Sequence, residues 1–340
     1  MPIRRDEGAP LVAEVASAVR RCDRLVVAVS GGIDSMVLLD IVAAIASAKR
    51  PPLLVATFDH GTGPHSARAA NLVQQTAARF GLDSVVGQST RRGARESEWR
   101  VERWAFLRAT ARAFGGFVAT AHTLDDHIET VFMRILREAG PRGLAGLLAE
   151  SDVIRPFVGT RRAQIQQYAD ANGVRVVEDP SNDSREHLRN RVRLDLLPAI
   201  TRVRRSFPDE LLNLSRTAAD WRVGMHAAAD AVMTIPGGDG SLRIARSALA
   251  GYDAESLRSL WPAIAARAHV VMDRRGTHRL AEFTIKGHTG GSIQLSGGIE
   301  VRMFRDHLLL RKWDASRVEV ARNARMRLGG HREPASAGHA

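Results

Sequence analysis

Three acids and a histidine gather in the segment "TAHTLDDHIET", residues 120–130. An apolar run precedes the segment and helical spacing follows it, so we expect a strand to end here and a helix to begin. On that helix Asp125 and Asp126 lie one turn before Glu129, and His122 comes just before the first turn. One acid in a first turn complements the helix dipole, but three acids beside a histidine exceed that need. The segment therefore favours a site for Mg²⁺ or for a cationic substrate.

The segment "LVVAVSGGIDS", residues 25–35, takes a buried strand directly into two glycines. We expect Ser30–Gly32 to form the turn and Ile33–Ser35 to open the next helix. Glycines allow the backbone to approach a ligand closely, and the free N–H groups at a helix start bind anions. The segment is neither a Walker loop nor a G-x-G-x-x-G fingerprint. By itself it favours phosphate binding only modestly over an ordinary strand-to-helix turn.

Asp59 and His60 follow the next apolar run, in the segment "FDHGTG". Open parallel sheets bind ligands beyond the carboxyl ends of their strands, so we expect these two residues beside the glycine turn. By itself the pair is more typical of residues that cap and turn a loop.

Arginines surround Asn190 in the segment "EDPSNDSREHLRNRVR", residues 178–193. On a helix Arg189 and Arg193 share one face, where they can pair with phosphates or with a carboxylate. A solvated basic face explains this segment equally well when it is taken alone.

Short apolar runs alternate with amphipathic stretches between residues 25 and 121, which predicts a doubly wound α/β domain around a parallel sheet. We expect strands over residues 25–29, 53–58, 84–86, 117–121 and 174–177. We expect helices over residues 36–46, 97–114, 125–137, 161–171 and 190–197, the last one ended by Pro198.

The second part of the chain predicts a smaller, mainly helical domain that ends in a short antiparallel β unit. Residues 209–284 have helical spacing. Apolar residues then alternate between the turns at 297–298 and 305–306, at Ile293/Leu295, Val301/Met303 and Leu308/Leu310. We place the domains at residues 1–204 and 205–315, and expect residues 316–340 to be a basic, disordered tail.

Composition narrows the class of protein. The 340 residues contain 49 basic against 37 acidic side chains, a net charge of +12 that favours a polyanionic partner such as nucleic acid. The single cysteine, Cys22, excludes an internal disulfide and a cysteine-based zinc cage. No apolar run approaches the roughly 20 residues of a membrane-spanning helix, and the first ten residues lack the apolar region of a signal peptide. We expect a cytoplasmic protein.

Taken in order, "SGGIDS", "DHG", "AHTLDDHIET" and "EDPSND" with the following "RNRVR" and "LLP" resemble the motifs of the tRNA(Ile)-lysidine synthetases, a family of PP-loop ATP pyrophosphatases. The resemblance covers about residues 25–198. The first motif indicates only the PP-loop group, and the third and fourth narrow it to this family. The resemblance implies a PP-loop, adenine nucleotide α-hydrolase-like fold for residues 1–204 and a tRNA-binding domain for residues 205–315.

The resemblance also implies a two-step ligation on the wobble cytidine of tRNA(Ile) with a CAU anticodon. In the first step ATP, with Mg²⁺, adenylates the base oxygen at C2 and pyrophosphate leaves. In the second step free L-lysine displaces AMP through its ε-amine. The codon read changes from AUG to AUA.

The same resemblance assigns roles to three sets of residues. The ATP-binding set is Ser30, Gly31, Gly32, Ile33, Asp34, Ser35, Asp59 and His60. The metal ligands are Asp34 with Asp125 or Asp126, of which Asp126 is the preferred candidate. The catalytic set is Asp34, His122, Asp125, Asp126, Glu129, Arg189 and Arg193. Within this set, Asp126 and Glu129 are the candidates for the lysine ammonium. Arg189 is the candidate for the lysine carboxylate or an AMP phosphate, and His122 for proton transfer or for orienting the base.

Three positions depart from the family pattern. The third motif usually has a second histidine where this chain has Thr123, and a glutamine where it has His127. The arginine that usually follows Asp-His-Gly is missing at Thr62-Gly63. The first two departures concern the metal or the substrate, and the third concerns one basic contact.

Alternatives of two classes remain open. Another PP-loop enzyme would sulfurate tRNA or aminate a small molecule, but sulfuration generally relies on cysteines near the site, and amination on a glutaminase or another ammonia source. A non-catalytic, nucleotide-dependent RNA-binding protein would use the same loop and charge, but would not need the carboxylates.

Overall fold

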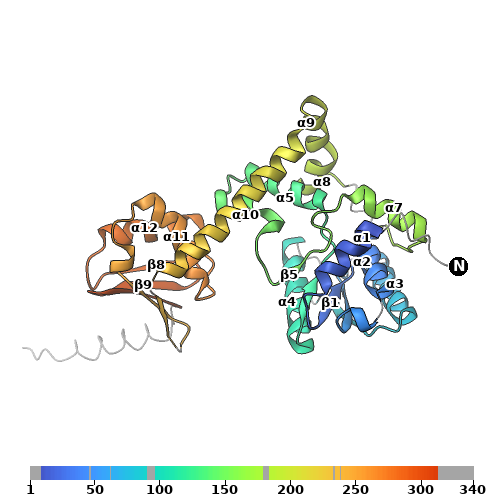
Figure 1. Ribbon diagram of the computed structural model, residues 1–340, viewed down its shortest axis with the longest axis horizontal. Coiled ribbons are helices and arrows are strands. Elements are labelled where there is room, and N and C mark those ends of the chain that lie inside the picture. The colour runs from blue at the N-terminus through green and yellow to red at the C-terminus, as the bar shows by residue number, and fades with distance from the viewer. Residues whose placement is uncertain are drawn as a thin grey trace, which may run out of the picture. The chain divides into compact units, whose positions relative to one another are not determined.

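The computed structural model describes residues 9–45, 47–61, 63–89, 96–178, 184–232, 234–237 and 239–312. The chain forms two compact units, Met1–Ala219 and Asp220–Ala340 (Figure 1). The division falls inside helix α10 (Phe207–Ala231), whereas the sequence analysis placed it before this helix, at 204/205. A single long helix contributes to both units, and helical spacing alone cannot show where along such a helix one core ends. The predicted tail at 316–340 lies outside the described residues.

The first unit is built on a five-stranded parallel sheet with the order β3-β2-β1-β4-β5. The strands are β1 (Leu25–Ala28), β2 (Leu53–Asp59), β3 (Ser84–Gln88), β4 (Phe117–Ala119) and β5 (Val153–Ile154). Strands β2 and β3 add on one side of β1, and the chain then crosses over so that β4 and β5 add on its other side. The carboxyl ends of β1 and β4 therefore flank the switch point at which sheets of this kind bind ligands.

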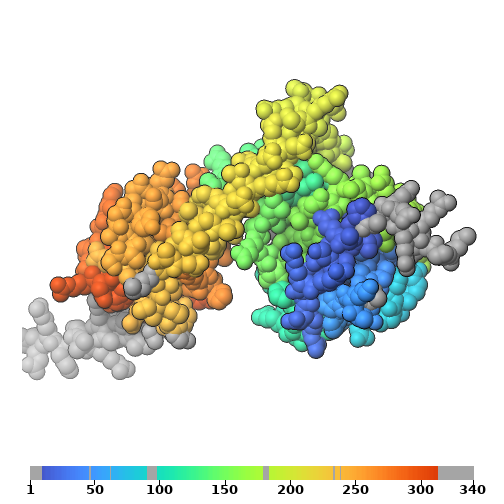
Figure 2. Space-filling view, in the orientation of Figure 1, coloured from blue at the N-terminus to red at the C-terminus, as the bar shows by residue number. Residues whose placement is uncertain are grey.

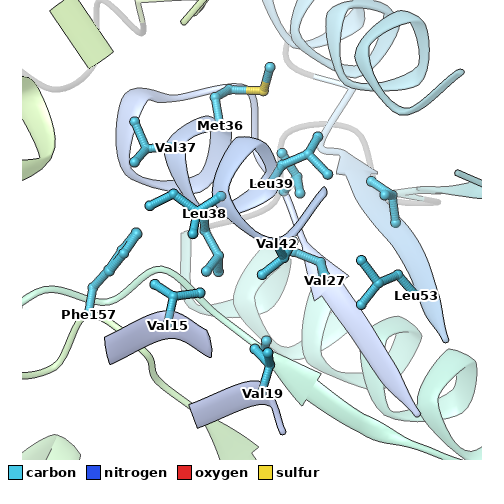
Figure 3. Close-up of a cluster of buried hydrophobic side chains, with 14 of the residues drawn as sticks. Val15, Val19, Val27, Met36, Val37, Leu38, Leu39, Val42, Leu53 and Phe157 are labelled. Carbon is cyan, nitrogen blue, oxygen red and sulfur yellow. The ribbon is translucent and has the colours of Figure 1, made fainter. Parts of the chain in front are cut away.

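Both faces of β1 are buried, as the continuous apolar runs predicted. Leu25 and Val27 pack into a cluster with helices on one face, and Val26 packs with α4 (Glu96–Phe114) on the other. The helices in the first cluster are α1 (Ala9–Val19), α2 (Ile33–Ala44), α3 (Pro64–Arg79) and α7 (Arg162–Asn172). Figure 3 shows side chains from α1, α2 and β1 in this cluster, and the outward side of α1, dark blue in Figure 2, lies at the surface. The predicted doubly wound fold is confirmed.

A second group of helices follows β4 in the chain. It comprises α5 (Leu124–Leu136), α6 (Pro141–Leu144), α8 (Leu188–Arg191), a π-helical turn (Val192–Leu196), α9 (Leu197–Val203) and the first part of α10. Leu124, Ile128 and Phe132 of α5 pack with Val192 and Leu211 in a separate apolar cluster. Short 3₁₀ turns lie at Ser47–Lys49, Gly146–Leu148 and Ser247–Leu249.

Two local predictions were wrong. Pro198 does not end a helix: it lies in the first turn of α9, directly after the π-helical turn, and the chain stays helical to Val203. Residues 174–177 do not form a strand. The N–H of Val177 instead donates to the carbonyl of Gly31 at 3.0 Å, so this segment fastens the loop after β1.

The second unit contains an antiparallel sheet with the order β6-β7-β10-β9-β8 and two helices. Its strands are β6 (Thr234–Pro236), β7 (Leu242–Ala245), β8 (Ser292–Leu295), β9 (Ile299–Met303) and β10 (His307–Lys312), and its helices are α11 (Ala254–Ala266) and α12 (Arg274–Lys286), besides the end of α10. The three last strands confirm the predicted β unit. Strands β6 and β7 were not predicted, because they are short and lie within residues 209–284, whose overall spacing indicated helices.

No described helix combines the length and apolar character needed to cross a bilayer.

The geometry of the loop after β1 predicts that alanine substitutions at its two glycines lower the stability of the protein by different amounts. Gly31 has a φ of +88°, and a β-carbon there would lie 2.9 Å from the Cβ of Ala69 in α3. Gly32 has a φ of −76°, and its β-carbon would meet only the Oγ of Ser30, at 3.7 Å. We expect Gly31→Ala to lower the free energy of unfolding by about 1–3 kcal/mol and Gly32→Ala by less than about 0.5 kcal/mol. Urea unfolding measures both, and equal midpoints would contradict the loop geometry.

Candidate active site at the carboxyl ends of the strands

The loop Ser30–Gly32 joins β1 to α2 and is shaped by one hydroxyl group. The Oγ of Ser35 accepts the N–H of Ser30 at 3.1 Å and donates to the carbonyl of Gly32 at 2.9 Å. Gly32 is the N-cap residue of α2, and no side chain caps this helix. The first turn of α2 therefore keeps N–H groups that can bind an anion.

Asp34 lies in this first turn with one carboxylate oxygen lacking a partner. Its Oδ2 is 3.7 Å from the Nε of Arg162, whereas Oδ1 is buried and has no hydrogen bond among the described residues. Burial raises the pKa of Asp34 to about 6, against the opposing effect of Arg162. An unpaired, buried carboxylate oxygen is a suitable ligand for a hard cation.

One carboxylate oxygen of Asp126 caps helix α5, and the other contacts Arg162. Its Oδ2 accepts the N–H of Thr123 at 2.9 Å in a capping box at the start of α5, and its Oδ1 is 3.0 Å from Nη2 of Arg162. Burial acts to raise the pKa of Asp126, but the Arg162 guanidinium and the Thr123 amide outweigh it, so the pKa is lowered.

Glu129, one helical turn later, is 3% exposed and lies between two arginines. Its Oε2 is 3.1 Å from Nε of Arg189, and its Oε1 is 3.6 Å from Nη1 of Arg162. Arg189 also donates to the hydroxyl of Thr130 at 3.1 Å. Burial and the neighbouring Asp126 raise the pKa of Glu129 more than the two arginines lower it.

Both carboxylate oxygens of Asp125 contact residues at the start of α7. Its Oδ2 accepts the backbone N–H of Arg162 at 2.7 Å, and its Oδ1 is 3.5 Å from Nη1 of Arg161. Asp125 thus caps the start of α7 from α5 and fixes where Arg162 leaves the backbone.

Arg162 is the residue that the sequence analysis missed. One guanidinium contacts Asp34, Asp126 and Glu129, which come from two helices far apart in the chain. Burial acts to lower the pKa of Arg162, but the carboxylates, Asp126 first, raise it above the ordinary value. One signal was present in the sequence: an arginine pair at a helix start is unfavourable for the dipole and therefore suggests a partner elsewhere.

His122 lies between β4 and α5, with its Nδ1 2.7 Å from the hydroxyl of Thr120. Burial lowers its pKa to about 4, which outweighs the opposing effect of Asp126. The imidazole is therefore neutral near pH 7, and three neighbouring arginines, Arg155, Arg189 and Arg100, lower the pKa further.

Asp59 and His60 end β2. Asp59 fastens its own loop, because its Oδ1 accepts the N–H of Gly61 at 2.8 Å and the hydroxyl of Ser66 at 2.5 Å. The ring of His60 lies 5.1 Å from that of Phe58 and 5.9 Å from that of Trp99, centroid to centroid. The capping alternative thus describes Asp59 well in this structure.

Arg193 lies half-buried in the π-helical turn that follows α8. The face that Arg189 and Arg193 were predicted to share depends on regular α-helical spacing. The π turn begins at Val192 and changes that spacing before Arg193. It is Arg189 whose guanidinium pairs with Glu129.

The acids do not form a ready-made metal cage. Among the described residues, no three histidine, cysteine or acidic side chains are grouped so that they could hold a metal ion. Asp34 and Asp126 both face the Arg162 guanidinium instead. Two carboxylates nevertheless fit Mg²⁺, which usually takes its remaining ligands from substrate phosphates and water.

The chain matches the family of PP-loop domains over residues 10–200. It is 38% identical over 227 residues to the tRNA(Ile)-lysidine synthase of Salinispora arenicola (strain CNS-205), covering 62% of this chain and 68% of that protein. It is 34% identical over 278 residues to the tRNA(Ile)-lysidine synthase of Methylobacterium sp. (strain 4-46), covering 78% of this chain and 80% of that protein. The chain belongs to the tRNA(Ile)-lysidine synthase family of PP-loop proteins.

A solved structure supports the fold of this family member. The U34-tRNA thiolase NcsA from Methanococcus maripaludis superposes with a TM-score of 0.53 at 14% identity, over 64% of this chain and 81% of that chain. At this identity the likeness shows the fold alone.

Two departures from the lysidine synthase pattern have structural roles here. Thr123 caps α5, where its hydroxyl accepts the N–H of Asp126 at 3.1 Å. His127 is fully buried: its Nδ1 accepts the N–H of Leu147 at 3.1 Å, so Nε2 carries the proton and donates to the hydroxyl of Ser215, 2.7 Å away. Burial lowers the pKa of His127 to about 4. The third departure, at Thr62, lies outside the described residues.

The hydrogen bonds of His127 can be tested with two variants, one of which introduces the glutamine that is usual in the lysidine synthase family. A glutamine can accept from Leu147 and donate to Ser215, as His127 does, so we expect His127→Gln to change the free energy of unfolding by less than about 1.5 kcal/mol. His127→Ala leaves a cavity and two unmet hydrogen bonds, and we expect a loss of about 2–4 kcal/mol. Denaturant unfolding compares the two, and similar losses in both would argue against this hydrogen-bond role.

Proposed function

We propose that this protein ligates free L-lysine to C2 of the wobble cytidine in tRNA(Ile) with a CAU anticodon, at the expense of ATP. The observation that carries the proposal is the group of Asp34, Asp126 and Glu129 with two arginines at the switch point of the sheet. Membership of the lysidine synthase family supports it. The enzyme class is a ligase that forms a carbon–nitrogen bond.

In the first step the loop after β1 and the start of α2 bind the phosphates of ATP through backbone N–H groups. The base oxygen at C2 attacks the α-phosphorus, the bond to the β-phosphate oxygen breaks, and pyrophosphate leaves. The loop has no Walker lysine, so the stabilisation of phosphate charge there falls to N–H dipoles and to a cation.

Asp34 and Asp126 are the residues that would hold Mg²⁺. The unpaired Oδ1 of Asp34 supports this assignment. When bound, Mg²⁺ would offset the negative charge of the phosphates and stabilise the leaving pyrophosphate.

In the second step Asp126 and Glu129 would hold the lysine ammonium, and Arg189 the lysine carboxylate. The deprotonated ε-amine attacks C2, the bond from C2 to the adenylated oxygen breaks, and AMP leaves with that oxygen. The attacking nitrogen becomes acidic as its new bond forms. Neutral His122 is our candidate for accepting its proton or for orienting the base.

The net charge of +12 supports a tRNA substrate, since arginine contacts to phosphates contribute affinity without reading the sequence. Localisation in the cytoplasm fits such a substrate.

The alternatives make different demands on the site. A sulfurating enzyme would need cysteines near the adenylated base, but Cys22 precedes the amino end of β1, while the acids lie beyond the carboxyl ends of the strands. A non-catalytic RNA-binding protein would have no use for three carboxylates around one guanidinium.

The central experiment measures pyrophosphate released from ATP with tRNA(Ile) in the presence of Mg²⁺, with and without lysine, and determines the mass of the tRNA afterwards. We expect pyrophosphate release that depends on tRNA, and a tRNA that gains lysine only when lysine is added. Release that is indifferent to lysine, with sulfur gained from a donor, would indicate a sulfurating enzyme. No release at all would leave the RNA-binding alternative.

Two isosteric variants separate the steps. Asp34→Asn removes a metal ligand, so we expect adenylation to fall at least about 100-fold while tRNA affinity stays within about twofold. Glu129→Gln removes charge from the ammonium site, so we expect lysine transfer to fall more than adenylation and adenylated tRNA to accumulate. Single-turnover assays with labelled ATP follow both steps. Equal losses in the two steps for Glu129→Gln would contradict its ammonium role, and full activity of Asp34→Asn would contradict the metal assignment.

A further inference from the structure

Arg162 occupies the centre of the carboxylate group, with each guanidinium nitrogen toward a different acid. Nη2 lies 3.0 Å from Asp126, Nη1 lies 3.6 Å from Glu129, and Nε lies 3.7 Å from Asp34. Only the contact with Asp126 has the length of a hydrogen bond in which both groups are well satisfied. The guanidinium therefore offsets the charge of Asp34 but leaves its Oδ1 without a hydrogen bond.

The backbone N–H of Arg162 is hydrogen-bonded, whereas its side chain is partly exposed. Its N–H donates to Asp125 at 2.7 Å in the first turn of α7, so the backbone cannot follow the side chain. The side chain is 30% exposed and can reach solvent. A ligand that enters this site can thus displace the guanidinium without disturbing the helix.

Displacement of the Arg162 guanidinium would change the net charge of this group of residues. The three carboxylates and the two guanidiniums of Arg162 and Arg189 sum to a charge of −1 when all are ionised. Without Arg162 the same group would carry −2 and attract cations more strongly.

We propose that Arg162 is an internal counter-cation that keeps these acids from binding a divalent metal ion until nucleotide phosphates arrive. Arginine pairs well with phosphate, so the phosphates of a bound nucleotide draw the guanidinium away from Asp34 and Asp126. The two carboxylates then become available to a metal ion that shares the phosphates. Arg162 thereby couples metal binding to nucleotide binding. This inference rests on the proposed function only for the identity of the nucleotide.

The test is a titration of the full chain with Mn²⁺ alone, in the absence of nucleotide, followed by electron paramagnetic resonance of the free ion. We expect Arg162→Gln to bind Mn²⁺ at least about tenfold more tightly than the unsubstituted protein. A second neutral variant, Arg162→Met, keeps the length of the side chain and gives an independent reading. Arg162→Lys retains the charge, so we expect its affinity to stay within about threefold of the unsubstituted protein.

Arg161→Gln is the matched control. Arg161 precedes Arg162 in the chain, but its guanidinium pairs with Asp125 and Asp209 rather than with the three central acids. We expect its removal to leave Mn²⁺ affinity unchanged. Adding Asp34→Asn to Arg162→Gln should abolish the gain, because Asp34 is the acid with the unpaired oxygen.

Three results would overturn the proposal: unchanged or weaker Mn²⁺ binding in the folded neutral variants, an equal gain in Arg161→Gln, or a gain that survives Asp34→Asn. Circular dichroism confirms that each variant is folded. The titration needs neither tRNA nor lysine, so its failure leaves the ligase proposal standing. Conversely, failure of the ligase assay does not alter the Mn²⁺ result.

Discussion

The contact between one guanidinium and three carboxylates is the constraint on which the site depends. Like charges this close repel one another by several kcal/mol in a protein, so the acids can be held together only around a cation. Arg162 provides that cation, and Arg189 adds a second one at Glu129. Burial acts to raise the pKa of both Asp126 and Glu129. At Asp126 the Arg162 guanidinium and the Thr123 N–H outweigh burial, whereas at Glu129 the neighbouring Asp126 adds to it.

The parallel sheet explains how these charges meet. Asp34 follows β1, the acids of α5 follow β4, and the two strands are neighbours whose carboxyl ends point to the same edge. Arg162 reaches that edge because Asp125 caps the start of α7. Removing any of these elements would leave charges without partners. The charged groups of the site therefore depend on the strand order of the sheet.

Much of the fold and of the candidate site can be predicted from the sequence. The features that were not predicted share physical causes. The buried strands and the acids of α5 follow from local apolar patterns and from an excess of charge over what capping needs. Arg162 could not be found in this way, because its importance lies in contacts with residues up to 128 positions earlier in the chain. The short strands β6 and β7 and the π turn before Arg193 depend on tertiary packing, which a local period does not record.

Two departures from the family pattern, Thr123 and His127, lie at positions with structural roles. Thr123 caps a helix, and His127 links α5 to the loop at Leu147 and to Ser215. A cap needs only a side-chain oxygen, and a buried link needs only one donor and one acceptor at suitable distances, so more than one residue type meets each requirement. The carboxylates around Arg162 have no such freedom, because an amide in place of any of them would change the charge that the guanidinium balances. On these physical grounds, positions 123 and 127 can accept other residue types more readily than the positions of the three carboxylates.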